Sequence, residues 1–197
     1  MAESDSDLEL VMALRGGDEA ALSALMDIYQ QRIFSFIYRH IFHETDAREL
    51  TQEVFVRLYF HISKFKPDAK FSTWLYQIAL NLCRDHLKSR AARQRAVTES
   101  LFPTDSADAR PAREFAIETG TPADQLLLKE QMEELERGMT ALPLDLRTAL
   151  VLAVIEQRSH QECAELLQTT PKTIETRVYR ARKHLLEWLT KAGLALV

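Results

Sequence analysis

Apolar residues recur at every third or fourth position through most of the chain, a spacing that predicts helices rather than strands. In the first half, the pattern predicts one helix over Asp7–Arg15, which turns Leu8, Val11 and Met12 inward. A longer helix follows, with Asp18 as its cap and apolar residues as far as Ile37. With further helices in the second half, the sequence predicts an all-α protein.

The strongest local pattern is a predicted helix-turn-helix between Ser159 and Leu189. Ser159 and Glu162 have the spacing of a capping box, which opens a short helix ending at Leu167. Thr170 is the predicted cap of the second helix, and Pro171 occupies its first position, where a missing N–H costs little.

The second helix of this pair divides into an apolar stripe and a polar, basic side. The stripe predicted to be buried consists of Ile174, Val178, Ala181, Leu185 and Leu189. The other faces carry Lys172, Thr173, Thr176, Arg177, Tyr179, Arg180, Arg182 and Lys183, with Glu175 among them. Cations for phosphates and short polar side chains for base edges suit a helix in a DNA major groove, although a solvated bundle helix would also be amphipathic.

A third predicted helix, Asp46–Ile62, has an acidic and amide-rich side opposite its apolar stripe. The stripe consists of Leu50, Val54, Leu58 and Ile62. The polar side carries Asp46, Glu49, Gln52 and Glu53, which could be solvated surface or could dock onto a basic partner helix. The preceding turn holds His43 beside carboxylates without metal-ligand spacing, so we expect capping there, with Thr45 or Asp46 opening the helix.

A lysine-rich loop, Lys64–Lys70, precedes a predicted helix over Phe71–Arg90 that Ser72 can cap. The side chains expected to face inward are Leu75, Ile78, Ala79 and Leu82, and those expected to face outward are Tyr76, Gln77, Asn81, Arg84, Asp85 and Lys88. Aromatic rings interleaved with cations and amides suit single-stranded nucleic acid. Trp74 alone would fit a core position equally well.

The composition changes between Ala96 and Pro122, where prolines and acids replace the apolar period, so this segment is a predicted linker. It separates a domain over residues 1–95 from a second domain over residues 123–197. The second domain begins with a helix start at Pro122 and Asp124, and a further helix opens at Leu142–Pro143. The core positions predicted for them are Leu126, Leu127, Met132, Leu135 and Met139, then Leu146, Leu150, Ala153 and Val154.

The chain has 197 residues, 46% of them hydrophobic, and a formal net charge of −4. An acidic chain with basic helices suggests that some faces meet DNA while acidic faces meet a basic partner. No apolar run reaches membrane-spanning length and no signal peptide is apparent, so we expect a cytoplasmic protein with no membrane insertion. Cys83 and Cys163 are expected to be buried thiols, and the sequence predicts no metal or other cofactor.

Three runs together resemble one family. The run Asp46–Tyr59 looks like the polymerase-binding helix of bacterial sigma factors, and Phe71–Asn81 with Asp85 resembles their promoter-melting helix. The run Thr173–Arg182 with Leu185 is similar to their C-terminal recognition helix. Two helical domains joined by a flexible linker match the extracytoplasmic-function (ECF) branch, and the resemblance covers nearly the whole chain.

The resemblance implies three sets of contact residues. Polymerase binding would use Asp46, Glu49, Gln52, Glu53 and Phe55. The downstream promoter element, with one base extruded near Trp74 and Asn81, would be held by Lys64, Lys66, Lys70, Phe71, Trp74, Asn81, Arg84 and Lys88. The upstream element would be read by Lys172, Thr173, Glu175, Thr176, Arg177, Tyr179, Arg180 and Lys183. The implied partners are core RNA polymerase, promoter DNA and an anti-sigma factor, and the linker would thread the polymerase interior.

Some residues depart from the family pattern, and other functions stay open. Gln157–Arg158 stand where a glycine is usual, Lys172 replaces a common glycine in the turn, and Glu175 stands where a basic residue is frequent. A helix-turn-helix regulator that binds duplex DNA as a dimer, or a sigma-like regulator that opens no promoter, would share the C-terminal pattern. An enzyme is disfavoured, because Asp85–His86 diverge on a helix and the chain has no glycine-rich phosphate loop.

Overall fold

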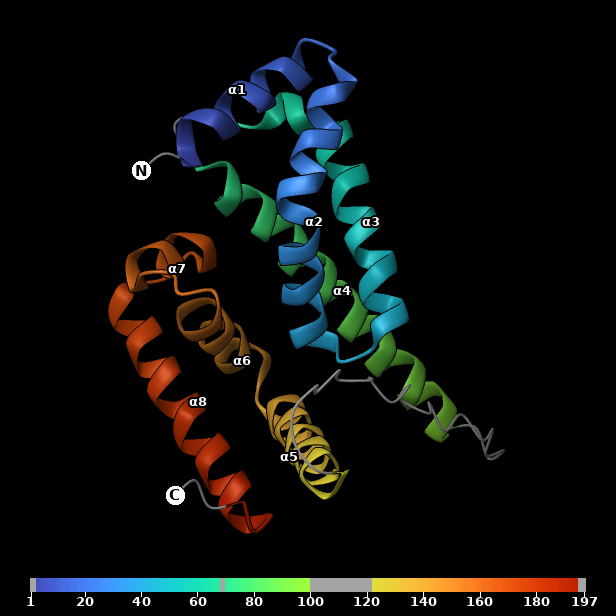
Figure 1. The fold of residues 1–197 in the computed structure, drawn as a ribbon, viewed down its shortest axis with the longest axis vertical. Coiled ribbons are helices and arrows are strands. Elements are labelled where there is room, and N and C mark those ends of the chain that lie inside the picture. The colour runs from blue at the N-terminus through green and yellow to red at the C-terminus, as the bar shows by residue number, and fades with distance from the viewer. Residues whose placement is uncertain (1–2, 68–69, 100–121, 195–197) are drawn as a thin grey trace. The chain divides into compact units, whose positions relative to one another are not determined.

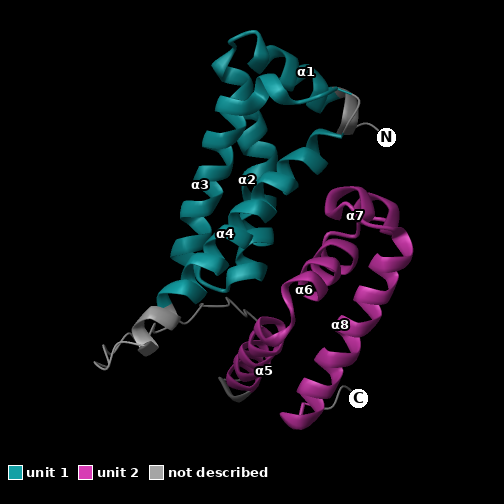
Figure 2. Cartoon of the chain, turned by 180° about the vertical axis from the view of Figure 1, so that it is seen from behind, with its two compact units in different colours: residues 1–110 teal, residues 111–197 magenta. Residues whose placement is uncertain are grey.

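The computed structural model describes residues 3–67, 70–99 and 122–194. All regular structure within these residues is helical, which confirms the all-α prediction (Figure 1). The chain divides into two compact units, residues 1–110 and residues 111–197 (Figure 2). Most of the predicted linker lies outside the described residues, and each unit is described by itself below.

The N-terminal unit is a helical bundle of α1 (Glu3–Arg15), α2 (Glu19–Ile41), α3 (Glu44–His61) and α4 (Phe71–Glu99). Helices α2, α3 and α4 pack against one another, and α1 packs across α2 and α4 (Figure 1). A short 3-10 turn, η1 (Ile62–Lys64), follows α3. The largest fully buried side chains of the bundle include Leu25, Ile33, Phe36, Ile37, Leu58, Leu75 and Tyr76.

The helix boundaries of this unit follow from local caps, some of which differ from the sequence expectation. Asp18 caps α2 as predicted, and its carboxylate accepts a hydrogen bond from Ala20 N–H (2.9 Å). The cap of α3 is His43 rather than Thr45 or Asp46, because its imidazole Nδ1 accepts from the Asp46 N–H (3.3 Å). Histidine is not among the usual capping residues, which is why the pattern missed it.

Four further expectations for the N-terminal unit were wrong. Helix α4 does not end at Arg90 but runs to Glu99, and Ser72 lies inside its first turn rather than at its cap. Tyr76 is buried instead of exposed, because its ring packs edge-on against Phe36 at a centroid distance of 4.9 Å. Met12 is 51% exposed rather than buried on α1.

The C-terminal unit contains α5 (Pro122–Ala141), α6 (Leu144–Leu150), α7 (His160–Leu167) and α8 (Pro171–Lys191). A π-helical turn, η2 (Val151–Ile155), extends α6. Helix α8 packs against α5, α6 and α7 and so organises the unit (Figure 2). The predicted stripe of α8 is confirmed, since Ile174, Val178, Ala181 and Leu189 are buried and Leu185 is half-buried.

The predicted core face of α5 is only partly correct. Met139 is buried and Leu135 is half-buried, but Leu126 is 58% exposed, Leu127 is 52% exposed and Met132 is 36% exposed. The packed part of α5 is its second half, where Gly138 lies against α8. Val154, predicted to be apolar core, is also exposed.

Both cysteines are free and buried, as the sequence predicted. Cys163 lies on α7, and its burial raises the pKa of the thiol to about 11. Such a thiol is almost entirely protonated at neutral pH, which makes it a poor nucleophile. Its role is therefore packing within the helix-turn-helix.

Candidate functional site

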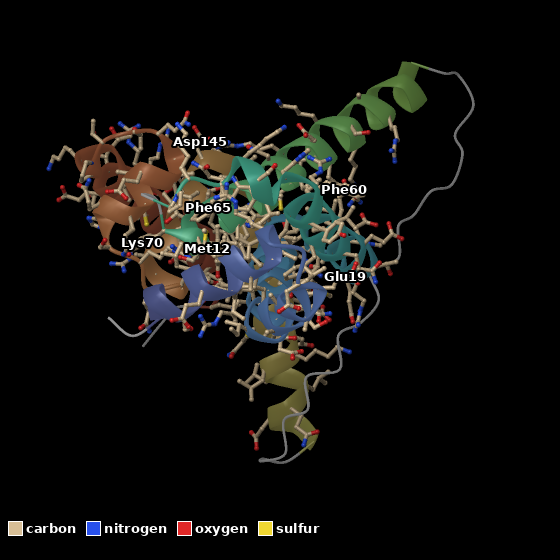
Figure 3. All side chains as sticks on the ribbon, turned by 90° about the horizontal axis from the view of Figure 1, so that it is seen from above. Met12, Glu19, Phe60, Phe65, Lys70 and Asp145 are labelled. Atoms are coloured by element: carbon tan, nitrogen blue, oxygen red, sulfur yellow. The ribbon has the colours of Figure 1, made fainter. Side chains whose placement is uncertain are left out.

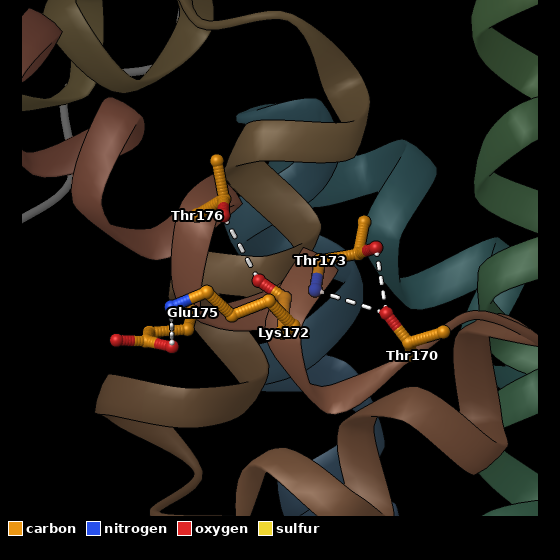
Figure 4. Close-up of polar contacts among 5 residues, drawn as sticks. All are labelled: Thr170, Lys172, Thr173, Glu175 and Thr176. Carbon is orange, nitrogen blue, oxygen red and sulfur yellow. Dashed lines mark hydrogen bonds and ion pairs between the residues drawn. The ribbon is translucent and has the colours of Figure 1, made fainter.

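Helix α8 begins with a well-formed cap that fixes the side chains around its first turn (Figure 4). The Thr170 hydroxyl accepts a hydrogen bond from the Thr173 N–H at 3.2 Å, and Pro171 follows at the first position. The Ser159–Glu162 capping box fixes the start of α7 in the same way, with the Ser159 N–H donating to the Glu162 carboxylate (3.0 Å). The helix-turn-helix pattern of the sequence is confirmed.

We call the side of α8 opposite its buried stripe the reading face. It comprises Lys172, Thr173, Glu175, Thr176, Arg177, Tyr179, Arg180 and Lys183. Tyr179 is 68% exposed, and Arg180 and Lys183 are also exposed. Arg180 and Lys183 put cations on the reading face, which can meet the anionic surface of a duplex.

Several polar groups of the reading face are engaged within the protein. Lys172 Nζ lies 2.9 Å from Glu175 Oε2, and the hydrogen bond and charge of Lys172 lower the pKa of Glu175 (Figure 4). Arg177, half-buried, pairs across to α6, where its Nη2 lies 3.1 Å from Asp145 Oδ2. The Thr176 hydroxyl donates to the Lys172 carbonyl at 2.9 Å. These groups must exchange an internal partner for DNA if they are to contact it.

The N-terminal unit gathers aromatic rings at the lysine-rich loop, and we call this set the aromatic cluster. The ring of Trp74 lies 5.5 Å from that of Phe65 and 6.3 Å from that of Phe71, and Tyr29 packs edge-on against Phe71 at 5.5 Å. Phe65 and Phe71 are buried, whereas Trp74 is half-buried. Phe71 is therefore a support for Trp74 rather than an exposed contact, contrary to its place in the predicted set.

The polar residues of the predicted downstream set lie at the surface, along the loop and along α4. Lys64, Lys66 and Lys70 of the loop are exposed, and on α4 Asn81 and Lys88 are exposed while Arg84 is half-buried. Phe65 was not among the predicted contact residues. Its position in the lysine-rich loop was the available signal, because an aromatic residue there has the neighbouring rings of α4 to pack on.

The predicted acidic side of α3 divides into exposed and engaged residues. Glu49 and Gln52 are exposed, and Glu53 is half-buried with its carboxylate 2.8 Å from Arg57 Nε. The Asp46 carboxylate lies 3.1 Å from His43 Nδ1 and 3.1 Å from His86 Nε2 of α4, distances at which an ion pair requires a protonated imidazole. Phe55 is 4% exposed and belongs to the core, which contradicts its prediction as an accessible contact.

Within the described residues, no three side chains of His, Cys, Asp or Glu are arranged to hold a metal ion. The same part of the chain holds no helix long and apolar enough to cross a membrane.

Comparison with known protein families identifies two regions of the chain. The Sigma-70 region 2 family matches residues 25–93, which span most of the N-terminal bundle. The Sigma-70, region 4 family matches residues 132–185, which include the helix-turn-helix. The two matches place the aromatic cluster and the reading face in separate family regions.

Comparison with individual proteins extends the similarity to nearly the whole chain. The RNA polymerase sigma-H factor of Pseudomonas aeruginosa is 31% identical over 93% of both chains. The ECF RNA polymerase sigma-E factor of Escherichia coli K12 is 29% identical over 93% of this chain and 94% of its own.

Solved structures share the fold. The structure of CnrH, in complex with the cytosolic domain of CnrY, has a TM-score of 0.65 at 23% identity, covering 95% of this chain and 99% of the other. RpoE of Bartonella quintana, in complex with the anti-sigma factor NepR, has a TM-score of 0.62 at 19% identity, covering 85% and 96%.

Proposed function

Since the chain belongs to the RNA polymerase sigma factors of the extracytoplasmic-function type, we propose how its surfaces divide the work of initiation. The protein binds core RNA polymerase and directs promoter recognition, strand opening and the start of transcription. The observation that supports this assignment is the presence of the aromatic cluster in one unit and of the basic reading face in the other. The aromatic cluster suits an unpaired strand, and the reading face suits a duplex.

The upstream promoter element is read by the reading face of α8. Arg180 donates to guanine and Glu175 accepts from a cytosine amino group, with Tyr179 and the threonines beside them. Lys183 and Arg180 are exposed, so they can meet DNA without losing an internal partner. Lys172 and Arg177 contact phosphate only after leaving Glu175 and Asp145.

The downstream element is captured as a single strand beside the aromatic cluster. The half-buried ring of Trp74 is the stacking surface, and Phe65 and Phe71 hold it in place from behind. Lys64, Lys66, Lys70, Arg84 and Lys88 attract the phosphates, and Asn81 hydrogen-bonds the extruded base. Unstacking one base costs a few kcal/mol, which stacking and polar contacts offset.

Core polymerase docks on the acidic side of α3 through Glu49, Gln52 and Glu53. Asp46 is half-buried beside His43 and His86 of α4, so it lies at the edge of this docking face. A basic helix on the polymerase is the complementary partner for this face.

An anti-sigma factor binds the protein and covers these surfaces, which keeps the protein inactive. The structure of RpoE of Bartonella quintana in complex with the anti-sigma factor NepR supports a protein partner of this kind. The protein acts in the cytoplasm, where the polymerase and the chromosome are. It carries out no catalysis of its own, and the polymerase supplies the chemistry.

The first test is transcription in vitro by core polymerase on fragmented genomic DNA, with and without this protein. We expect RNA from discrete start sites only when the protein is present, and alignment of those sites gives both promoter elements. Absence of transcripts together with tight binding of the pure protein to a duplex would favour a helix-turn-helix regulator instead. Trp74→Ala with Asn81→Ala should abolish opening, and normal opening by that variant would refute the strand-capture role.

A further inference from the structure

Helix α3 exposes apolar side chains on the same side as its acidic residues. Phe60 is 71% exposed and Val56 is 49% exposed, although both belong to a well-packed helix. Helix α3 packs on α2 and α4 through Ala47, Thr51, Val54, Phe55 and Leu58. Neither Val56 nor Phe60 belongs to that buried set, so both are open to a partner.

The helical spacing places these residues in one row. Glu49, Glu53, Val56 and Phe60 follow one another at steps of four, three and four, which is one face of a helix. The row is acidic toward the start of α3 and apolar toward its end. From Glu53 to Phe60 the rise is about 10 Å, so one partner helix can meet both ends.

The Phe60 ring contacts one neighbouring aromatic ring on the surface of α3. Its neighbour Tyr59 packs against it edge-on, with ring centroids 5.5 Å apart and an interplanar angle of 83°. Tyr59 is itself 41% exposed, so the pair forms an exposed aromatic patch. An aromatic side chain has few rotatable bonds for its contact area, so it loses little conformational freedom on binding, which suits an interface anchor.

We propose that Phe60, with Val56, is the apolar anchor by which the N-terminal unit docks onto core polymerase. The occupant is a helix of the polymerase that carries basic side chains opposite Glu49 and Glu53. The same helix carries an apolar position one to two turns further along, opposite Val56 and Phe60. This inference rests on the proposed function, since it extends the acidic docking face of α3 toward the end of that helix.

Charge and apolar contact make separable contributions to such an interface. The acidic half attracts a basic helix, and its contribution weakens as salt screens the charges. The apolar half contributes by removing hydrocarbon from water, which moderate salt does not screen. The structure also supplies a control in Met12, an apolar residue of comparable exposure on α1, a different element of the same unit (Figure 3).

The test measures equilibrium binding of the full-length protein to core polymerase at roughly 50 and roughly 300 mM salt. Salt screens charge–charge attraction more strongly at the higher concentration. Phe60→Ser should weaken binding about tenfold or more at both salt concentrations. Val56→Ser should weaken it less, and Phe60→Tyr, which keeps the ring, should bind like the wild type. Met12→Ser should stay within about twofold, because a scattered surface apolar residue makes no specific contact.

A double variant tests the acidic half separately. Glu49→Lys with Glu53→Lys should weaken binding most at low salt, where the charges act most strongly. If this variant is defective while Phe60→Ser and Val56→Ser bind normally, the apolar anchor is wrong and the acidic docking face stands. If the wild type itself does not bind core polymerase, the proposed function fails. Thermal unfolding of each variant confirms that the bundle is intact, as expected for side chains this exposed.

Discussion

At the scale of single residues, two glutamines bracket α7 in a backbone conformation that usually selects glycine. Gln157, just before α7, has a φ of 51°, and Gln168, at the end of α7, also has a φ of 51°. A side chain in the left-handed region brings its Cβ close to the carbonyl oxygen, which costs about 1 kcal/mol or more. A glycine is usual in the family at Gln157–Arg158, so the glutamine found there costs the folded protein some stability.

Gln157→Gly should stabilise the C-terminal unit by roughly 0.5–1 kcal/mol, because glycine adopts this conformation without strain. In a Trp74→Phe background, Trp188 is the one tryptophan left of the two in the chain. Urea unfolding followed by its fluorescence then reports the C-terminal unit. Gln161→Gly, an exposed position inside α7, is the matched control and should destabilise the unit by about 1 kcal/mol. A loss of stability in Gln157→Gly would show that the conformation carries no strain.

Cys163 should make the protein less stable at alkaline pH. Burial raises the pKa of this thiol from 9.0 to about 11, so the unfolded chain loses its proton at a lower pH than the folded chain. Stability from this group is complete below pH 9 and is lost as the pH rises toward 11. The free energy of unfolding of Cys163→Ala should fall less steeply with pH over this interval than that of the wild type. Equal slopes for the two proteins would contradict the raised pKa.

At the scale of helices, Gly138 allows α5 and α8 to pack closely. A Cβ at this position would lie 2.9 Å from Leu185 Cδ1 and 2.9 Å from Trp188 Cδ1. The indole cannot easily move, because its Nε1–H donates to Glu134 Oε1 at 2.7 Å. The glycine is thus required by the neighbouring helix and not by its own backbone.

Gly138→Ala should destabilise the C-terminal unit by up to about 2 kcal/mol. The helix propensity of alanine favours the substitution by about 1 kcal/mol, but overpacking against α8 typically costs 1–3 kcal/mol. Thr140→Ala, an exposed change on the same helix, is the control and should stay within about 0.5 kcal/mol. Urea unfolding in the Trp74→Phe background, followed by the fluorescence of Trp188, measures both. A more stable Gly138→Ala protein would mean that α5 and α8 can separate freely.

The pair between Asp145 of α6 and Arg177 of α8 withholds a cation from the reading face. Asp145→Asn should release the Arg177 guanidinium and remove a negative charge near the phosphates. We expect tighter binding to non-specific duplex DNA and a log–log salt slope steeper by about one. Fluorescence anisotropy across a salt series measures the slope. Glu187→Gln is the control, because it also removes one carboxylate, but one on α8 outside this pair. An equal slope change there would refute a specific effect of the pair.

Particular elements show which features the sequence could predict. The caps of α7 and α8 were predictable, because Ser159, Glu162, Thr170 and Pro171 act on backbone groups a few residues away. The exposure of the first half of α5 could not be predicted, because Leu126 and its apolar neighbours have the sequence pattern of core residues. Only the positions of the packing partners show that they are exposed. The same holds for Phe55, Phe71 and Tyr76, where an aromatic ring fits either a contact surface or a core. Tertiary packing, and not local pattern, decided those positions.

At the scale of the whole molecule, the distribution of charge separates DNA recognition from DNA affinity. Between Pro171 and Lys183, α8 carries five cations and one carboxylate, yet the chain has a formal net charge of −4. Two of those five cations, Lys172 and Arg177, are paired with carboxylates. Because phosphate neutralisation supplies most of the affinity for DNA, the free protein has little with which to hold a duplex.

The free protein should therefore bind a promoter duplex only weakly, and core polymerase should be needed for a stable complex. We expect a Kd for the protein alone weaker than about 1 μM at physiological salt, in the range of non-specific binding. With core polymerase, the same duplex should be held tightly, since the polymerase adds its own DNA contacts to those of the reading face. The difference in affinity is measured by filter binding to a promoter that transcription in vitro has identified. The duplex is mixed with the protein alone, with core polymerase alone, and with both together. Nanomolar binding by the protein alone, at a palindromic site, would instead indicate a dimeric helix-turn-helix regulator, whose affinity resides in its own two copies.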